Sequence, residues 1–192
     1  EIMKNFASLV YSLDQTTKTN KKIELLASFF ENALNSDKLW CIALFSGRRP
    51  KRLISTSYLR EWACEVTKLP TWLLEDTYSV IGDLAETISL LTPEKNQFSE
   101  KSLTAWISEL RQLEKQSIEE KRHFVVNAWA TLNKKECFVF NKLITGGFRL
   151  GVSQKLTLKA LAKITNIDEF EISLRLMGDW HPDTISWNNL II

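Results

Sequence analysis

Residues that favour irregular structure are few in this chain of 192 residues, which holds only six glycines and four prolines. Hydrophobic residues make up 44% of it and include seven tryptophans and ten phenylalanines. This composition excludes a disordered or low-complexity chain, and the length suits one domain or two closely packed subdomains. We therefore expect a folded chain with a hydrophobic core.

Cysteine and histidine are scarce as well. Cys41, Cys64 and Cys137 are odd in number, and each lies within an apolar helical pattern, which suits buried reduced thiols better than a disulfide framework. His123 and His181 are the only histidines and are far apart, so no spacing typical of metal ligands is present. We expect no metal site in this chain.

Long hydrophobic runs are missing too. No run of about 18 apolar residues is present, and the beginning of the chain lacks the pattern of a signal peptide. We expect a cytoplasmic protein that makes no contact with a membrane.

The net charge of +2 does not by itself indicate a nucleic-acid partner, but the charges are unevenly distributed. Acidic residues are concentrated in the middle of the chain. A fold that gathered the basic clusters on one side would present a cationic face. These clusters are Lys18/Lys21/Lys22, Arg48/Arg49/Lys51/Arg52 and Lys134/Lys135/Lys142/Arg149/Lys155/Lys159/Lys163.

Apolar residues recur with helical spacing along nearly the whole chain, as in Phe6, Leu9, Val10 and Leu13. Capping boxes are predicted at residues 117–120 and 168–171. Alternating apolar and polar residues are rare. The sequence predicts an all-α fold of ten to twelve helices in one domain, residues 1–192, with a soft boundary between two packed helical halves at residues 92–99.

The stretch 142–155 is the most informative one. Gly146, Gly147 and Gly151, half of the glycines, lie here with Arg149 between two apolar helical patterns. Glycine permits φ > 0 and close approach to a ligand, and Ser153 can cap the following helix beside its outward-facing N–H groups. The stretch is typical of a phosphate-facing joint between helices; the alternative is an ordinary C-cap glycine followed by a turn.

These residues resemble the N-terminal DNA-binding domain of ATP-dependent DNA ligases, particularly the bacterial type. The strongest match is LITGGFRLGVSQKL (143–156). Further matches follow the expected order over nearly the whole chain: LDQTTKTN (13–20), FSGRRPKR (45–52), LPTWL (69–73), GDLAET (82–87) and RLMGDW (175–180). Glu1 and Ile2 lie outside the resemblance, and we interpret Met3 as the natural start.

The resemblance implies a helical module that grips duplex DNA across the minor groove on both sides of a nick, without sequence preference. Nicked double-stranded DNA and the catalytic domains of the same polypeptide would be its partners, and we expect a monomer. The implied DNA-binding residues are Gly146, Gly147, Arg149, Gly151, Ser153 and Lys155, the second joint at Gly82, and the loops with Thr17, Lys18, Thr19, Lys21, Lys22, Arg48, Arg49, Lys51 and Arg52.

The ligases form a lysyl-adenylate at a Lys-x-Asp-Gly motif, and no lysine here has that context. We therefore expect no catalytic residue in this chain and no ligation by it alone. The nucleotidyltransferase and OB-fold domains would be absent, and they would use the ATP and Mg²⁺ of the full-length enzyme.

Other interpretations apply to several of these residues. Asp83 and Glu86 are interpreted as charges favoured by a helix N-terminus rather than as a catalytic pair. Trp40, Trp62, Trp106 and Trp129 fall on apolar helical faces and are predicted to be core. The alternative function is a helical protein-interaction or scaffold module whose basic clusters are only solvated. Salt dependence of DNA binding separates the two.

Overall fold

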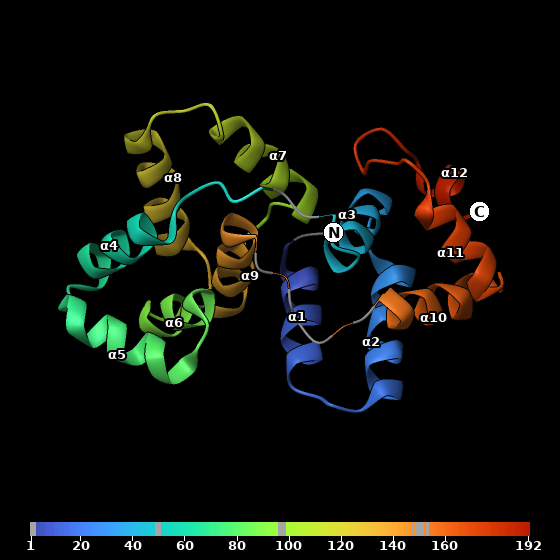
Figure 1. Ribbon diagram of the computed structural model, residues 1–192, viewed down its shortest axis with the longest axis horizontal. Helices are drawn as coiled ribbons and strands as arrows, with labels where there is room; N and C mark the ends of the chain where they lie inside the picture. Colours follow the sequence, from blue (N-terminus) through green and yellow to red (C-terminus); the bar gives the residue numbers. More distant parts are fainter. Residues whose placement is uncertain (1–2, 49–50, 96–98, 147, 149–151, 153) are drawn as a thin grey trace. The chain divides into compact units, whose positions relative to one another are not determined.

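The computed structural model describes residues 3–48, 51–95, 99–146, 148, 152 and 154–192. Within these residues the chain is helical and holds no strand, which confirms the predicted all-α class (Figure 1). The helices are α1 (Met3–Asp14), α2 (Thr19–Asn32), α3 (Asn35–Phe45), α4 (Thr56–Thr67), α5 (Thr71–Ile81), α6 (Leu84–Leu91), α7 (Leu103–Leu113), α8 (Ile118–Thr131), α9 (Lys134–Thr145), α10 (Gln154–Thr165), α11 (Glu169–Met177) and α12 (Trp187–Ile191).

Short polar side chains begin several of these helices. The Ser117 hydroxyl accepts a hydrogen bond from the Glu120 N–H at 3.2 Å, which is the N-cap half of the predicted capping box. Asp168 also caps its helix, but its carboxylate accepts from the Phe170 N–H at 2.9 Å rather than from the third residue. The local sequence thus predicts where a helix starts. Which backbone N–H donates to the cap side chain depends on the local backbone conformation.

The chain forms two compact units, and the first comprises Glu1–Arg49, Ser102–Thr104 and Phe148–Ile192. In this unit α10 packs against α2, and α11 contacts both α10 and α12 (Figure 1). Aromatic rings fill its core: Phe6 meets Phe29 and Phe148 with ring centroids 5.9 and 6.1 Å apart. Burial of these rings removes a large apolar area from water and stabilises the unit.

The second unit comprises Pro50–Lys101 and Ala105–Gly147. Its α6 packs against α9, and α5 contacts both α4 and α6. The rings of Trp106, Phe124 and Phe140 form one cluster in its core, with centroid distances of 5.5 to 6.2 Å. The indole N–H of Trp129 donates to the Asn141 Oδ1 at 2.7 Å, so the polar atom of this buried ring is satisfied.

The predicted boundary at residues 92–99 does not separate the two units, because those residues belong to the second one. Each unit is instead built from segments that are far apart in sequence. The reason is that α10, late in the chain, packs on α2, near its beginning, so the chain returns to its first unit after completing the second. Local composition does not predict that the chain returns to its first unit.

The core prediction for the tryptophans of apolar helical faces is confirmed. Trp40, Trp62, Trp106 and Trp129 are each at most 4% exposed. The sequence also favours a core position for Trp72, and this prediction is wrong, since Trp72 is 65% exposed. The tryptophans therefore serve mainly to fill the core.

None of the described helices is long and apolar enough to cross a membrane. The described residues also contain no group of three or more His, Cys, Asp or Glu side chains able to hold a metal ion.

The cysteines are predicted to differ in reactivity. Burial raises the pKa of the Cys137 thiol to about 12, and burial together with the charge of Asp37 raises the pKa of Cys41 well above its ordinary value. Only Cys64 is partly exposed. Since the thiolate is the reactive form, iodoacetamide at pH 8 should modify Cys64 first, and Cys41 and Cys137 only after unfolding. Mass spectrometry of the labelled peptides checks this; labelling of Cys137 at the rate of Cys64 would contradict it.

Candidate functional site

The first of the two glycine joints that the structure describes is Gly82, between α5 and α6. Gly82 has φ +80° and donates its N–H to the Tyr78 carbonyl at 2.7 Å, which ends α5. It is exposed, and a Cβ added to it would meet no atom within 4 Å. The left-handed backbone thus favours glycine, and the space beside it is open.

The second described joint is Gly146, at the end of α9. It has φ +73°, and its N–H donates to the Lys142 carbonyl at 2.9 Å. The C-cap interpretation of this glycine is therefore confirmed. Gly147, Arg149, Gly151 and Ser153, which the sequence also predicted for the site, lie outside the described residues.

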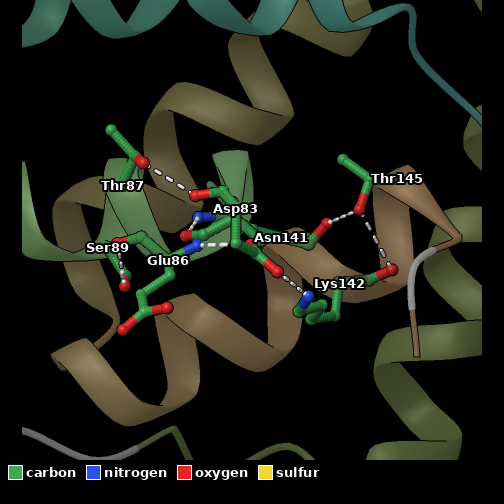
Figure 2. A network of polar contacts seen from close by, with 8 residues as sticks. Asp83, Glu86, Thr87, Ser89, Asn141, Lys142 and Thr145 are labelled. Carbon is green, nitrogen blue, oxygen red and sulfur yellow. Dashed lines mark hydrogen bonds and ion pairs between the residues drawn. The ribbon is translucent and has the colours of Figure 1, made fainter. Parts of the chain in front are cut away.

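A salt bridge connects the surroundings of the two joints. Asp83, the residue after Gly82, pairs its Oδ2 with the Nζ of Lys142 (Figure 2). The carbonyl of Lys142 receives the Gly146 N–H. The side chains of Lys142 and Asp83 are 8% and 32% exposed. The other carboxylate oxygen of Asp83 accepts the Glu86 N–H at 3.0 Å, so Asp83 is the N-cap of α6.

A second link joins the same two helices. The side-chain amide of Asn141 donates to the Ala85 carbonyl at 3.3 Å. Two consecutive residues of α9 therefore each bridge to the first turn of α6. The sequence predicts that Asp83 lies at a helix N-terminus, but it gives no sign of the pairing with Lys142.

Two of the predicted basic residues lie near the same end of α9. The Leu53 N–H donates to the Ile144 carbonyl at 3.2 Å, so Lys51 and Arg52 directly precede a segment tied to the last turn of α9. Both are exposed, and neither forms an ion pair with a residue that the structure describes. We call Gly82, Gly146, Lys51 and Arg52 the α9-end cluster.

The remaining described candidates belong to the first unit. Thr17, Lys18, Thr19 and Lys21 are exposed around the start of α2, with Lys18 at the N-cap position, and Lys22 is partly buried. Lys155 is exposed in the first turn of α10, the helix that packs against α2. The structure therefore places the candidates in two groups, one in each unit.

Arg48 has a different environment from the other predicted residues. Its guanidinium donates to the carbonyls of Trp180 at 2.9 Å and Gly178 at 2.8 Å, and also to that of Leu176 at 3.2 Å. It also lies over the Trp180 ring, 4.7 Å from the centroid. A cation here satisfies the C-terminal carbonyls of α11. This geometry gives Arg48 a structural role, and we leave it out of the interface; Arg49 lies outside the described residues.

The comparison with known families follows this geometry. A family model described as "DNA ligase N terminus" matches residues 3–162. The chain belongs to this family. The match spans α1 to α9 and most of α10, and so includes every residue of the α9-end cluster. A search of curated proteins finds no match.

Membership identifies the chain as the N-terminal domain of a DNA ligase, which confirms that part of the resemblance drawn from the sequence. The Lys-x-Asp-Gly motif of lysyl-adenylate formation does not occur in the 192 residues. In this ligase domain the described residues provide exposed cations, glycine joints between helices, and helix caps.

The contacts of Arg48 predict a loss of stability when they are removed. Arg48→Ala should lower the free energy of unfolding by about 1 kcal/mol, because three carbonyls at and just after the end of α11 lose a charged donor, although Arg48 is exposed. Arg48→Lys should recover only part of this, since one ammonium cannot reproduce the fork of a guanidinium. Urea unfolding followed by circular dichroism measures both; a stability of Arg48→Ala equal to that of the unchanged protein would contradict the structural role.

Proposed function

We propose that this chain binds duplex DNA without sequence preference, as the N-terminal domain of an ATP-dependent ligase that seals nicks in repair, replication or recombination. The observation that carries the proposal is the α9-end cluster: two left-handed glycines and two exposed cations around one helix end, in a chain of the DNA ligase family. Nicked double-stranded DNA is the proposed ligand, and the protein is proposed to bind it as a monomer.

The chemistry of the cluster suits a sugar-phosphate backbone. Glycine has no side chain that would hold a phosphate away from the peptide N–H groups, and the space beside Gly82 is open. Lys51 and Arg52 offer cations that neutralise phosphates, which are the same for every base sequence. Contacts of these two kinds position a protein on DNA without reading its sequence.

We propose that these 192 residues take no part in forming the phosphodiester bond at the nick. ATP and Mg²⁺ would be used by nucleotidyltransferase and OB-fold domains of the same polypeptide, which would be its further partners. Its own contribution would be to hold the duplex.

One observation favours the alternative of a protein-interaction module. Phe170, Leu174 and Met177 lie at helical spacing on α11 and are 70%, 53% and 72% exposed. These residues lie outside the family match, which ends at residue 162. The apolar face of α11 does not explain the glycine joints, so we take DNA binding as the main function.

Fluorescence anisotropy tests the proposal. The purified chain is titrated against a labelled nicked duplex, the intact duplex and the single strand over a salt series. We expect binding to both duplexes, and a log affinity that falls by about 0.9 per log unit of salt for each phosphate neutralised. Absence of duplex binding at low salt by the folded chain would refute the proposal in favour of an interaction module.

Replacement of one exposed cation of the cluster gives a residue-level prediction. Arg52→Ala should weaken binding to all sequences about equally, severalfold at moderate salt, and reduce the salt slope by about 0.9, because one phosphate contact is lost. Lys115→Ala removes an exposed lysine from the loop between α7 and α8 and is the matched control. An unchanged slope for Arg52→Ala, or an equal loss for Lys115→Ala, would remove Arg52 from the interface.

A further inference from the structure

Among the basic residues of the 134–163 cluster that the structure describes, Lys142 alone is buried. Its side chain is only 8% exposed, and its Nζ pairs with Asp83 and lies 5.3 Å from the centre of the Phe138 ring. A cation in this environment is not presented to a phosphate on the surface. Its function must be sought in what it does to Asp83.

Asp83 creates a problem for phosphate binding at the neighbouring joint. Its carboxylate directly follows Gly82, is 32% exposed, and caps the N-terminus of α6. A negative charge at that place satisfies the helix end, but it repels a phosphate that approaches the same backbone. The Asp83 carboxylate therefore stabilises the start of α6 but disfavours the binding of an anionic ligand beside it.

The salt bridge resolves this conflict. The ammonium of Lys142 cancels the charge of Asp83 from the buried side, while the Asp83 Oδ1 still accepts the Glu86 N–H at 3.0 Å (Figure 2). The pairing also fixes the first turn of α6 to the last turn of α9, from which Gly146 follows. The Asp83–Lys142 salt bridge therefore both neutralises the charge of Asp83 and holds the Gly82 and Gly146 joints in place.

We infer that Lys142 is a positioning residue for DNA binding that acts through Asp83: it cancels the charge of the α6 cap, so that a phosphate can lie against the Gly82 and Gly146 joints. Lys142 itself does not contact DNA. This inference rests on the proposed function, and it distinguishes Lys142 from Lys51 and Arg52, whose cations are exposed.

The test compares three variants of the full 192-residue chain by anisotropy with a nicked duplex. Lys142→Met leaves the Asp83 charge uncompensated and should weaken binding on the order of tenfold. Asp83→Asn keeps a good N-cap but leaves the buried Lys142 ammonium without its charged partner, so it should lower the stability of the fold; for the folded fraction, the affinity should be equal to or higher than that of the unchanged protein. The double variant should recover most of the affinity that Lys142→Met loses.

Recovery in the double variant is the decisive result when Lys142→Met and the double variant have the same circular dichroism and urea midpoint, because the gain in affinity then reflects the removed charge rather than restored folding. The double variant also leaves no unpaired buried charge, so it remains informative if Lys142→Met does not fold. Arg122→Met is the matched control: it removes one cation from the salt bridge with Glu65, which joins α8 to α4 at 2.6 Å. Its affinity for DNA should not change.

Three results would overturn the inference. Equal weakening of Lys142→Met and the double variant, with a salt slope reduced by about 0.9, would make Lys142 a direct phosphate contact. Unchanged affinity of Lys142→Met, with binding by the unchanged protein, would refute this inference alone. No binding by the unchanged protein at low salt would refute the proposed function as well.

Discussion

The burial of one ammonium group determines how the end of α9 is built. Lys142 is nearly removed from water, and an ammonium in that position is tolerated only with a charged partner. The partner is the N-cap of α6, so α6 must begin beside the last turn of α9. The chain must then reverse just before Asp83, and a left-handed glycine at position 82 provides that reversal. The Asp83–Lys142 ion pair thus holds α6 against α9, includes the N-cap of α6, and lies next to both glycine joints.

Basic residues with similar surroundings in the sequence have different roles in the structure. Arg48 and Lys142 direct their charges at the chain itself, at the carbonyls that end α11 and at Asp83. Arg52 and Lys155 remain exposed. A count of charges in a segment therefore overestimates the cations available to a ligand, and the hydrogen-bond and ion-pair partners of each residue are needed to separate the two groups, because Arg48 is exposed as well.

The sequence predicts what depends on near neighbours. Helical periodicity, the caps at Ser117 and Asp168, and the core tryptophans are confirmed because each depends on residues only a few positions away. It did not predict the Asp83–Lys142 pair, 59 positions apart, or the Arg48–Trp180 contact, 132 positions apart. The division into units was missed for the same reason, since α10 packs on α2 only after the whole second unit has been traversed. Contacts of this kind follow from tertiary packing, which local patterns do not record.

The two glycine joints illustrate why a structural explanation does not exclude a functional one. The C-cap geometry fully explains why positions 82 and 146 are glycine, since each has positive φ and closes a helix with a backbone hydrogen bond. It does not explain why the space beside Gly82 is open, or why the cap that follows is neutralised from the buried side by a lysine. A serine or asparagine would cap α6 without needing a buried cation. An aspartate held by Lys142 caps the helix and fixes it to α9 while adding no net charge, which is the combination that an anion-binding surface requires.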